Sequence, residues 1–274
     1  MSAMKTTART LLAALALSAA LAAPALAATC GNNAAGFPAW LEDFKGEARA
    51  QGISQGTIQA ALGDVSYDKK VIGLDRNQKS FKLSLDQFME RRAPSSFVKK
   101  GKGIIAQNAG MLNAIEKRYG VQKEVLVAIW GMETGFGANS GNMNIFRSLA
   151  TLSYDCRRSD FFTEELLAAL QIVERGDKRA SDMRGAWAGE IGQTQFLAKN
   201  YLRFAVDGDG DGRRDLIRSK ADVLASTANF MQQHGWVAGA GYGPGETNYG
   251  VFRDWNRAGV YQQALALFAS KLAN

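Results

Sequence analysis

The chain is poor in histidine, cysteine and proline, with one, two and four of them in 274 residues. Because His234 is the single histidine, a Ser-His-Asp or Cys-His nucleophile would depend on it, and a zinc site with several histidines is excluded. We expect His234 itself to be a helix cap or a packing residue. Four prolines also exclude a proline-rich stalk. Chemistry must therefore come from carboxylates, amides, hydroxyls or a hard cation.

The overall composition is typical of a globular protein. Apolar residues make up 46% and charged residues 22%, which argues against a disordered or collagen-like chain. The 33 Lys and Arg against 26 Asp and Glu give a net charge of +7, which suits an anionic partner. The basic residues are scattered along the sequence, so we expect no nucleic-acid partner. The length fits one or two domains, and we expect a monomer.

Residues 1–27 have the features of a secretory signal peptide. Two basic residues precede the apolar run 11–23, and a small-x-small cleavage signal ends at Ala27. The run is shorter than the roughly 20 apolar residues of a membrane span, which makes an uncleaved anchor helix the less favoured alternative. The residues before Cys30 lack the leucine of a lipid-attachment signal, so we expect no lipid anchor. We predict an exported protein whose charge falls to 7 − 2 = +5 when the peptide is removed.

The exported chain keeps two cysteines, Cys30 and Cys156. In an oxidising compartment two thiols most simply form one disulfide, which here would join the start of the exported chain to its middle. Two free, buried cysteines are the alternative.

Apolar residues recur at helical spacing through most of the chain, and no block shows the alternation of strands. We therefore predict a mainly α fold, with a small β element near the glycine-rich stretches. An N-terminal helical subdomain is expected over residues 34–102 and a core over 103–274. The predicted helices cover residues 37–50, 54–62, 80–92, 103–119, 121–134, 161–175, 200–205, 220–234 and 261–272.

One carboxylate, Glu133, lies at the end of an apolar helix. Leu126, Ile129, Trp130 and Glu133 follow the i, i+3, i+4, i+7 pattern, and Gly135 then ends the helix. Apolar neighbours and the negative end of the helix dipole both favour the protonated acid, which is what a general acid needs. The alternative is a glutamate that pairs locally and reaches solvent past the helix end.

Cleavage of a glycosidic bond fits this chemistry, because it needs a proton for the leaving oxygen. Hydrolysis usually employs a second carboxylate, and Glu190 is the one other acid in a comparable setting. It lies in the glycine-rich segment 185–196, which allows close approach of the backbone to a ligand. In this segment Gln195 is placed to hydrogen-bond a sugar. Trp187 either stacks on a ring or, as we slightly favour, packs in the core.

An oxygen-rich loop begins at Asp207 and matches the first half of an EF-hand calcium loop. Position 12, usually a glutamate, is Arg218, and Asp222 replaces it only if the loop is longer. Any ion there is expected to be structural; the alternative is a solvated acidic turn. The candidate ligands are Asp207, Asp209, Asp211, the carbonyl of Arg213, Asp215 and Asp222.

Taken together, these segments resemble the lytic transglycosylase B family of exported enzymes that cleave peptidoglycan. The resemblance covers nearly all of the chain after the signal peptide. It is carried by an ordered string of motifs: Tyr119-Gly-Val, Gly131-Met-Glu-Thr-Gly-Phe-Gly, Leu149-Ala-Thr-Leu-Ser-Tyr, Arg157-Arg158-x-x-Phe161, Gly185-Ala-Trp-Ala-Gly-Glu-Ile-Gly-Gln-Thr-Gln-Phe, the Asp207 loop and Trp255-Asn256-Arg.

The resemblance implies a lysozyme-like α-rich core in a periplasmic enzyme, with Glu133 as the sole acid and base and no catalytic cofactor. Glu133 would protonate the oxygen between N-acetylmuramic acid and N-acetylglucosamine. It would then deprotonate the muramoyl C6 hydroxyl, which attacks C1 and leaves a 1,6-anhydro product. A hydrolytic muramidase and a catalytically weak peptidoglycan-binding protein remain alternatives.

The resemblance also implies the substrate contacts, with glycan strands and peptide stems as partners. Gln195 and Asn256 match polar residues near the glycan, and Arg157 and Arg158 match an arginine pair that meets the acidic stem. Phe230 and Trp255 stand where other members place tyrosine, so they lose the hydroxyl. Ala186 stands where some members carry a serine that could bond the catalytic carboxyl. The Asp207 loop matches the family's structural calcium loop.

Overall fold

The computed structural model describes residues 29–77 and 83–274. The predicted signal peptide, 1–27, lies outside the described residues. Among those described, no helix combines the length and the apolar character needed to cross a membrane.

Helices account for most of the described chain, which confirms the mainly α prediction. Two short strands, β1 (Met143–Asn144) and β2 (Arg184–Gly185), pair antiparallel. The α-helices are α1 (Phe37–Ala50), α2 (Gln55–Leu62), α3 (Lys69–Arg76), α4 (Leu85–Arg92), α5 (Ser95–Gln107), α6 (Ala109–Tyr119), α7 (Lys123–Thr134), α8 (Ile145–Tyr154), α9 (Ser159–Glu174), α10 (Ala198–Phe204), α11 (Lys220–Gln233), α12 (Phe252–Trp255) and α13 (Gly259–Ala273).

Local capping explains several of the helix ends. The Ser54 side chain accepts the Thr57 N–H at the start of α2, and Ser84 forms a reciprocal capping box at the start of α4. Gly135 ends α7 in the left-handed conformation, with φ 63°, which glycine adopts without strain. The sequence-based end of this helix is therefore confirmed.

The sequence-based helices were wrong in two ways: one predicted helix is two helices, and α3, α8 and α12 were not predicted. The predicted helix 103–119 is two helices, because the backbone at Asn108 leaves the helical region and its side-chain amide bonds the Ile104 carbonyl at 2.8 Å. The prediction also missed α8, in which nine of ten side chains are buried. Ile145, Leu149 and Leu152 do recur at helical spacing, so the signal for α8 was present and was overlooked.

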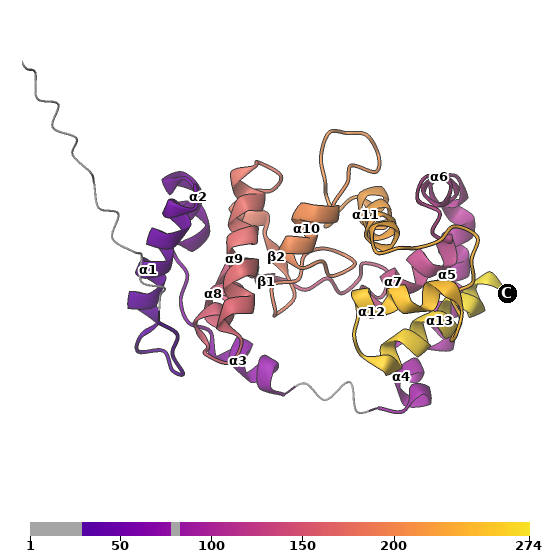
Figure 1. Ribbon diagram of the computed structural model, residues 1–274, viewed down its shortest axis with the longest axis horizontal. Coiled ribbons are helices and arrows are strands. Elements are labelled where there is room, and N and C mark those ends of the chain that lie inside the picture. Colours follow the sequence, from indigo (N-terminus) through magenta and orange to yellow (C-terminus); the bar gives the residue numbers. More distant parts are fainter. Residues whose placement is uncertain (1–28, 78–82) are drawn as a thin grey trace, which may run out of the picture.

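The elements form an elongated arrangement (Figure 1). At one end α1, α2 and α3 pack against α8 and α9; at the other α4, α5 and α7 surround α13. Between them, α10 contacts both α9 and α11. Helices α4 and α5 thus pack with the later part of the chain. The division of the chain at 102/103 stays a prediction.

A disulfide joins Cys30 to Cys156, which confirms the predicted bond. The Gly31 N–H also donates to the Tyr154 carbonyl at 2.8 Å. The bond closes a loop of 126 residues, and a cross-link of this kind stabilises a fold by about 2–5 kcal/mol, largely by restricting the unfolded chain. The start of the described chain is thereby held against the turn that precedes α9.

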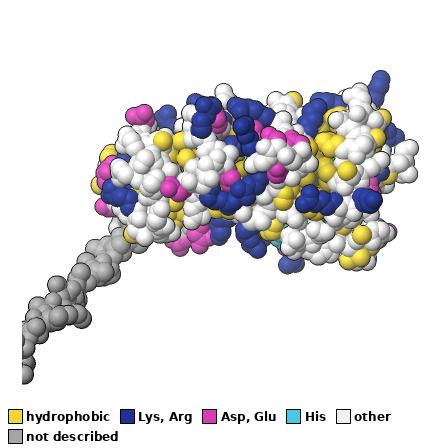
Figure 2. Space-filling model, turned by 90° about the horizontal axis from the view of Figure 1, so that it is seen from above, with side chains coloured by type: hydrophobic (Ala, Val, Ile, Leu, Met, Phe, Trp, Pro, Cys, Tyr) yellow, Lys and Arg dark blue, Asp and Glu magenta, His cyan; other side chains and the backbone are white. Residues whose placement is uncertain are grey.

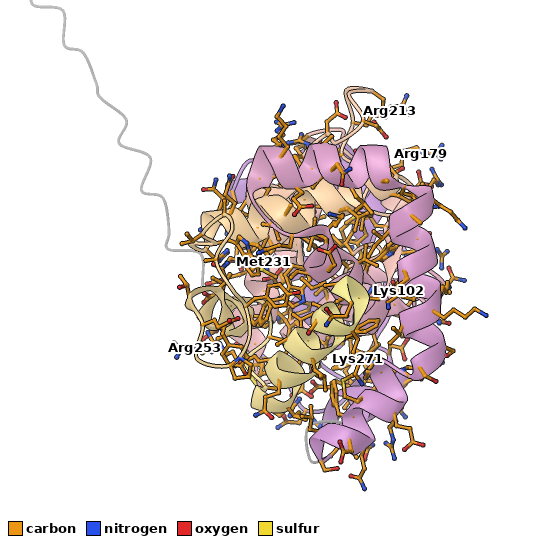
Figure 3. The ribbon with its side chains drawn as sticks, turned by 90° about the vertical axis from the view of Figure 1, so that its right-hand side faces the viewer. Lys102, Arg179, Arg213, Met231, Arg253 and Lys271 are labelled. Carbon is orange, nitrogen blue, oxygen red and sulfur yellow. A yellow bond between two sulfur atoms is a disulfide. The ribbon has the colours of Figure 1, made fainter. Side chains whose placement is uncertain are left out.

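Positive charge is spread over the surface. Figure 2 shows Lys and Arg side chains at several separate places along one face, interrupted by neutral and apolar surface. At the end of the molecule seen in Figure 3, Lys102 of α5 and Lys271 of α13 line one shallow hollow. This distribution agrees with the scattered basic residues of the sequence.

Candidate active site

Glu133, the second-last residue of α7, projects into a cleft between helices. Its Oε1 accepts hydrogen bonds from the Tyr261 hydroxyl at 2.6 Å and from the Trp255 indole N–H at 3.0 Å. Within residues 29–77 and 83–274 these are the two side-chain donors that reach the carboxyl. Oε2 is therefore the oxygen left to carry a proton toward the cleft.

The surroundings of Glu133 favour its protonated form. Burial raises the pKa of its carboxyl above the usual value. The hydrogen bonds from Tyr261 and Trp255 and the charge of Arg92 lower the pKa, but burial outweighs them. The direction agrees with the sequence-based expectation of a general acid. The Glu133 side chain is partly exposed, and it lines the cleft.

The cleft has a volume of about 570 Å³. It brings Glu133 together with four of the predicted substrate-binding residues, Gln195, Phe230, Trp255 and Asn256. The remaining lining residues are Phe88, Arg92, Met132, Asn139, Ala186, Trp187, Glu190, Thr194, Phe196, Leu197, Asn200 and Tyr261. Trp187, for which we slightly favoured core packing, is partly buried and lines the cleft as well.

The glycine-rich segment is bonded directly to α7. Trp130 donates its indole N–H to the Gln193 side chain at 3.0 Å, and the Thr134 hydroxyl donates to the Gln193 carbonyl at 2.6 Å. A Cβ on Gly137 would lie 2.3 Å from the Gln193 amide oxygen, so this close approach requires glycine. The segment that carries Gln195 is thus fixed beside the residue that follows Glu133.

Three of the predicted substrate-binding residues have internal partners. The Gln195 amide donates to the Gly192 carbonyl at 2.9 Å, on a backbone with φ 59°. The Asn256 side-chain oxygen accepts the Ala258 N–H at 3.0 Å. Phe230 is only 2% exposed and meets the Trp255 ring edge-on at 5.1 Å. Phe230 thus supports the indole that bonds Glu133.

His234 ends α11 and stacks on Phe230 with ring centroids 3.9 Å apart. Its Nδ1 lies 2.7 Å from the Phe230 carbonyl oxygen. The expectation of a capping and packing histidine is confirmed.

Arg157 and Arg158 do not line the cleft. Both guanidinium groups pair with the carboxylate of Asp75 on α3, which is only 4% exposed. They line a separate hollow of about 460 Å³, together with Ser159, Asp160, Phe161 and the disulfide. Burial raises the pKa of Glu190 in the cleft, and the charge of Arg158 opposes this rise only as a minor contribution.

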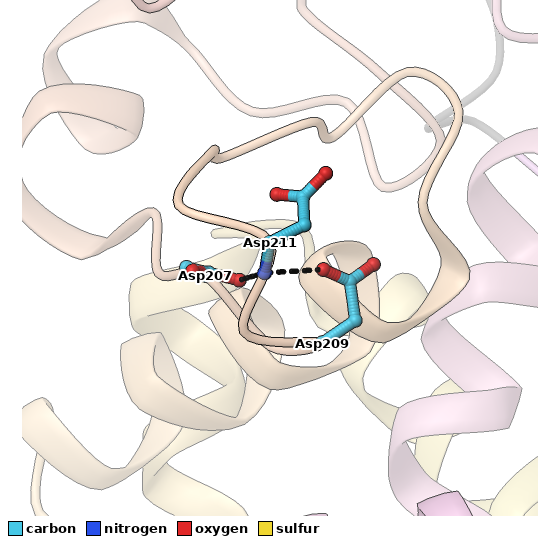
Figure 4. Close-up of side chains that lie close together, drawn as sticks. All are labelled: Asp207, Asp209 and Asp211. Carbon is cyan, nitrogen blue, oxygen red and sulfur yellow. Dashed lines mark hydrogen bonds between the residues drawn. The ribbon is translucent and has the colours of Figure 1, made fainter.

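Three acids of the predicted calcium loop come together. Asp207, Asp209 and Asp211 each place a carboxylate oxygen within 4.8 Å of the others (Figure 4). Asp207 accepts the N–H groups of Gly212 at 2.7 Å and Gly210 at 2.6 Å, and these backbone bonds lower its pKa. Two of these carboxylates, those of Asp207 and Asp209, also accept the Asp211 N–H (Figure 4).

The other two predicted acids bond within the protein. Asp215 pairs with Lys178 and accepts the Ile217 N–H at 3.0 Å. Buried Asp222 accepts the Gly208 N–H at 2.8 Å and the Asp215 N–H at 2.6 Å. These contacts close the loop at its two ends.

Sequence reasoning missed two residues of this region. Tyr261 was predicted only as the first residue of a helix, although it gives Glu133 its shorter hydrogen bond. Asp75, which holds the arginine pair, was given no role from the sequence. Trp255 was expected to lack the hydroxyl of the tyrosine that other family members place there. In the structure its indole N–H donates to Glu133 instead.

Comparison with known proteins shows a family match over most of the chain. The sequence profile of the family described as Transglycosylase SLT domain matches residues 36–245. The chain is also 37% identical over 129 residues to Membrane-bound lytic murein transglycosylase B of Escherichia coli (strain K12). That alignment spans 47% of this chain and 36% of the relative, so it covers about a third of the relative's length.

Solved structures share the fold. SltB3 from Pseudomonas aeruginosa in complex with NAG-NAM-pentapeptide has a TM-score of 0.83 and 32% identity, covering 87% of this chain and 80% of its own. The Escherichia coli lytic transglycosylase Slt35 in complex with calcium has a TM-score of 0.76 at 24% identity, covering 90% and 96%, a likeness of fold alone. The lysozyme-like fold expected from the sequence is thereby confirmed, and the resemblance found there is confirmed as well: this chain belongs to the transglycosylase SLT domain family.

Proposed function

We propose that this protein is a lytic murein transglycosylase. It cleaves the β-1,4 bond between N-acetylmuramic acid and N-acetylglucosamine in peptidoglycan without water and leaves a 1,6-anhydromuramoyl end. The observation that carries the proposal is the Glu133 carboxyl, whose pKa is raised by burial while it faces a polar cleft. The family match and the saccharide in the SltB3 complex support this substrate class.

Glu133 acts twice in the proposed reaction. Its Oε2 gives a proton to the glycosidic oxygen as the bond to the muramoyl C1 breaks. The carboxylate that results takes the proton of the C6 hydroxyl, and that oxygen forms the new bond to C1. Glu133 thus gives one proton to the leaving oxygen and takes one back from the C6 hydroxyl, so it ends the reaction in its starting form. Trp255 and Tyr261 hold Oε1 throughout, so the proton-carrying oxygen keeps its orientation.

Analysis of the products tests the proposal directly. Purified sacculi are digested, and the released muropeptides are examined by mass spectrometry. We expect anhydro-muropeptides from the wild type. Reducing muramic acid ends as the main product would instead identify a muramidase that uses water. Clearance no faster than that of the Glu133→Gln variant would indicate a binding protein without turnover.

Loss of the Tyr261 hydroxyl is expected to shift the pH profile. This hydroxyl stabilises the carboxylate and lowers the pKa of Glu133, so Tyr261→Phe raises that pKa further. The general acid then stays protonated to higher pH, and the alkaline limb of kcat/KM moves upward. The rate itself falls about ten- to a hundredfold, the range for one hydrogen bond to a charged group. Turbidity assays across pH measure both effects, and Tyr67→Phe, outside the cleft, should change neither.

We propose that Gln195, Asn256, Phe230 and Trp255 form the glycan site and that Arg157 and Arg158 face the acidic peptide stem. The half-exposed guanidinium groups, beside a hollow separate from the cleft, support a stem-binding role. The pentapeptide in the SltB3 complex is consistent with it.

A structural Ca²⁺ in the Asp207 loop is part of the proposal. The neighbouring carboxylates fit a hard cation, and Asp207, Asp209, Asp211 and the Arg213 carbonyl would hold it. Because Asp215 is already paired with Lys178 and Asp222 is fully buried, we assign them to the frame of the loop. The ion would neutralise three acids held close together.

Calcium is therefore expected to stabilise the fold. At a concentration of about a hundred times Kd, binding to the folded state adds about 2.7 kcal/mol to the free energy of unfolding. The shift in Tm with CaCl₂ measures this effect. In the Asp209→Asn variant the shift should be lost, whereas Asp160→Asn, outside the loop, should retain it. A Tm independent of calcium in the wild type would remove the ion from the proposal.

For localisation we propose export to the periplasm by a cleaved signal peptide over 1–27, and action there as a monomer. The relative with 37% identity is described as membrane-bound, a property of that protein. Mass spectrometry of the mature chain would locate the cleavage site.

A further inference from the structure

A second carboxyl, that of Glu190, lies in the cleft and has no role in the proposed reaction. It lines the same cavity as Glu133. The cation that acts on it, Arg158, forms its ion pair with Asp75 instead. Burial raises the pKa of Glu190, so water solvates it poorly before a ligand binds. A buried acid of this kind gains from any partner that donates hydrogen bonds to it.

The backbone around Glu190 is closely defined. The Ala186 N–H donates to the Glu190 carbonyl at 3.1 Å, and the Gly189 N–H donates to the Ala186 carbonyl at 3.2 Å. A Cβ on Gly185 would lie 1.9 Å from the Glu190 carbonyl oxygen, so the two strands of this turn touch. The backbone of the turn that carries Glu190 is therefore fixed.

One side-chain oxygen of Glu190 is used within the turn. Oε2 accepts the Ala188 N–H at 3.0 Å, and the backbone N–H of Glu190 also bonds the carboxyl, while no side chain of the described residues donates to it. The neighbouring amides are less available, since the Gln195 nitrogen and the Asn256 oxygen are already bonded to the backbone. Glu190 thus offers the cleft a strong acceptor beside two partly satisfied amides.

We propose that Glu190 is a substrate-binding residue, which accepts hydrogen bonds from hydroxyl or acetamido N–H groups of the glycan. The inference rests on the proposed function and deepens it. Sugars present such donors in number, and a hydrogen bond to a carboxylate is about twice as strong as one between neutral groups. Glu190 acts on binding of the strand, while Glu133 transfers the proton.

The test measures saccharide binding in the Glu133→Gln background, where turnover is blocked. The probe is a peptide-free tetrasaccharide of alternating N-acetylglucosamine and N-acetylmuramic acid, and Kd is measured by calorimetry. Adding Glu190→Ala is expected to weaken binding about tenfold or more, the range for a hydrogen bond to a charged group. Adding Glu190→Gln, which keeps an acceptor for Ala188, is expected to weaken it about threefold to tenfold. Glu164→Gln, an exposed acid outside the cleft, is the matched control and should leave Kd unchanged.

Three results would overturn the proposal. In the first, both Glu190 variants bind within about twofold of their parent, a difference well below one charged hydrogen bond. In the second, Glu190→Ala lowers Tm and weakens binding while Glu190→Gln binds like the parent, which is the signature of a turn-stabilising residue. A changed ratio of reducing to anhydro ends with unaltered Kd would likewise overturn it, because Glu190 would then act on water. If the Glu133→Gln parent binds no tetrasaccharide, or the wild type yields no anhydro ends, the proposed function fails and the inference with it.

Discussion

Glu133→Gln is expected to lower the rate of cell-wall cleavage by about 10³-fold or more, because general acid and base catalysis each contribute about 10²–10⁴. Glutamine keeps the size of the side chain and can still accept the Trp255 and Tyr261 hydrogen bonds through its amide oxygen. It carries no proton to deliver and cannot become a base. Initial rates of release of soluble muropeptides from purified sacculi measure the effect.

Two controls separate chemistry from folding and binding. The variant should unfold at nearly the wild-type Tm, since both hydrogen bonds at Oε1 can be kept. Glu164→Gln, which removes an exposed acid of α9, should cleave at the wild-type rate. If Glu133→Gln kept more than about a tenth of the activity, the proposed mechanism would be wrong, because the loss would be smaller than general acid and base catalysis contribute.

Removing both arginines that face Asp75 is expected to cost about 3–5 kcal/mol of folding stability, because a buried carboxylate is left without its cations. Asp75 is 4% exposed, and both guanidinium groups pair with it. Each single variant, Arg157→Gln or Arg158→Gln, leaves one cation in place and should cost about 1 kcal/mol. The double variant should therefore lose more stability than the sum of the single variants.

Denaturant unfolding of the four proteins in this cycle measures the coupling between the two arginines. Adding Asp75→Asn to the double variant removes the stranded charge and should recover part of the lost stability. Arg179→Gln is the surface control, because its pair with Asp182 is exposed and should change stability by less than about 0.5 kcal/mol. If the stability losses of the two single variants added up to the loss of the double variant, the two arginines would not share Asp75 as a buried partner.

Glu133 and the acidic loop that begins at Asp207 were accessible from the sequence because their signals are local. Apolar residues at helical spacing followed by Gly135 are enough to place a carboxyl at the end of a buried helix. Alternating acids and glycines are enough to bring Asp207, Asp209 and Asp211 together, and the structure shows them within 4.8 Å. Each of these features spans less than about four helical turns.

Helix prediction succeeded for most of the longer helices and missed α3, although one face of α3 is buried. The bounds of α1 match the prediction residue for residue, and those of α11 differ by one residue. The break at Asn108 escaped periodicity because it depends on a single backbone rotation, whereas α8 has apolar residues at helical spacing and was overlooked.

By itself, the sequence determined the helical class, the position of the acid at the end of α7 and the cysteines available for a disulfide. Tertiary structure alone decided which groups surround that acid. Trp255 and Tyr261 reach Glu133 across 122 and 128 residues, and Arg157 reaches Asp75 across 82. Helix formation depends on neighbours within one or two turns, whereas the pKa of a carboxyl depends on whatever the packing places around it, however distant in the chain.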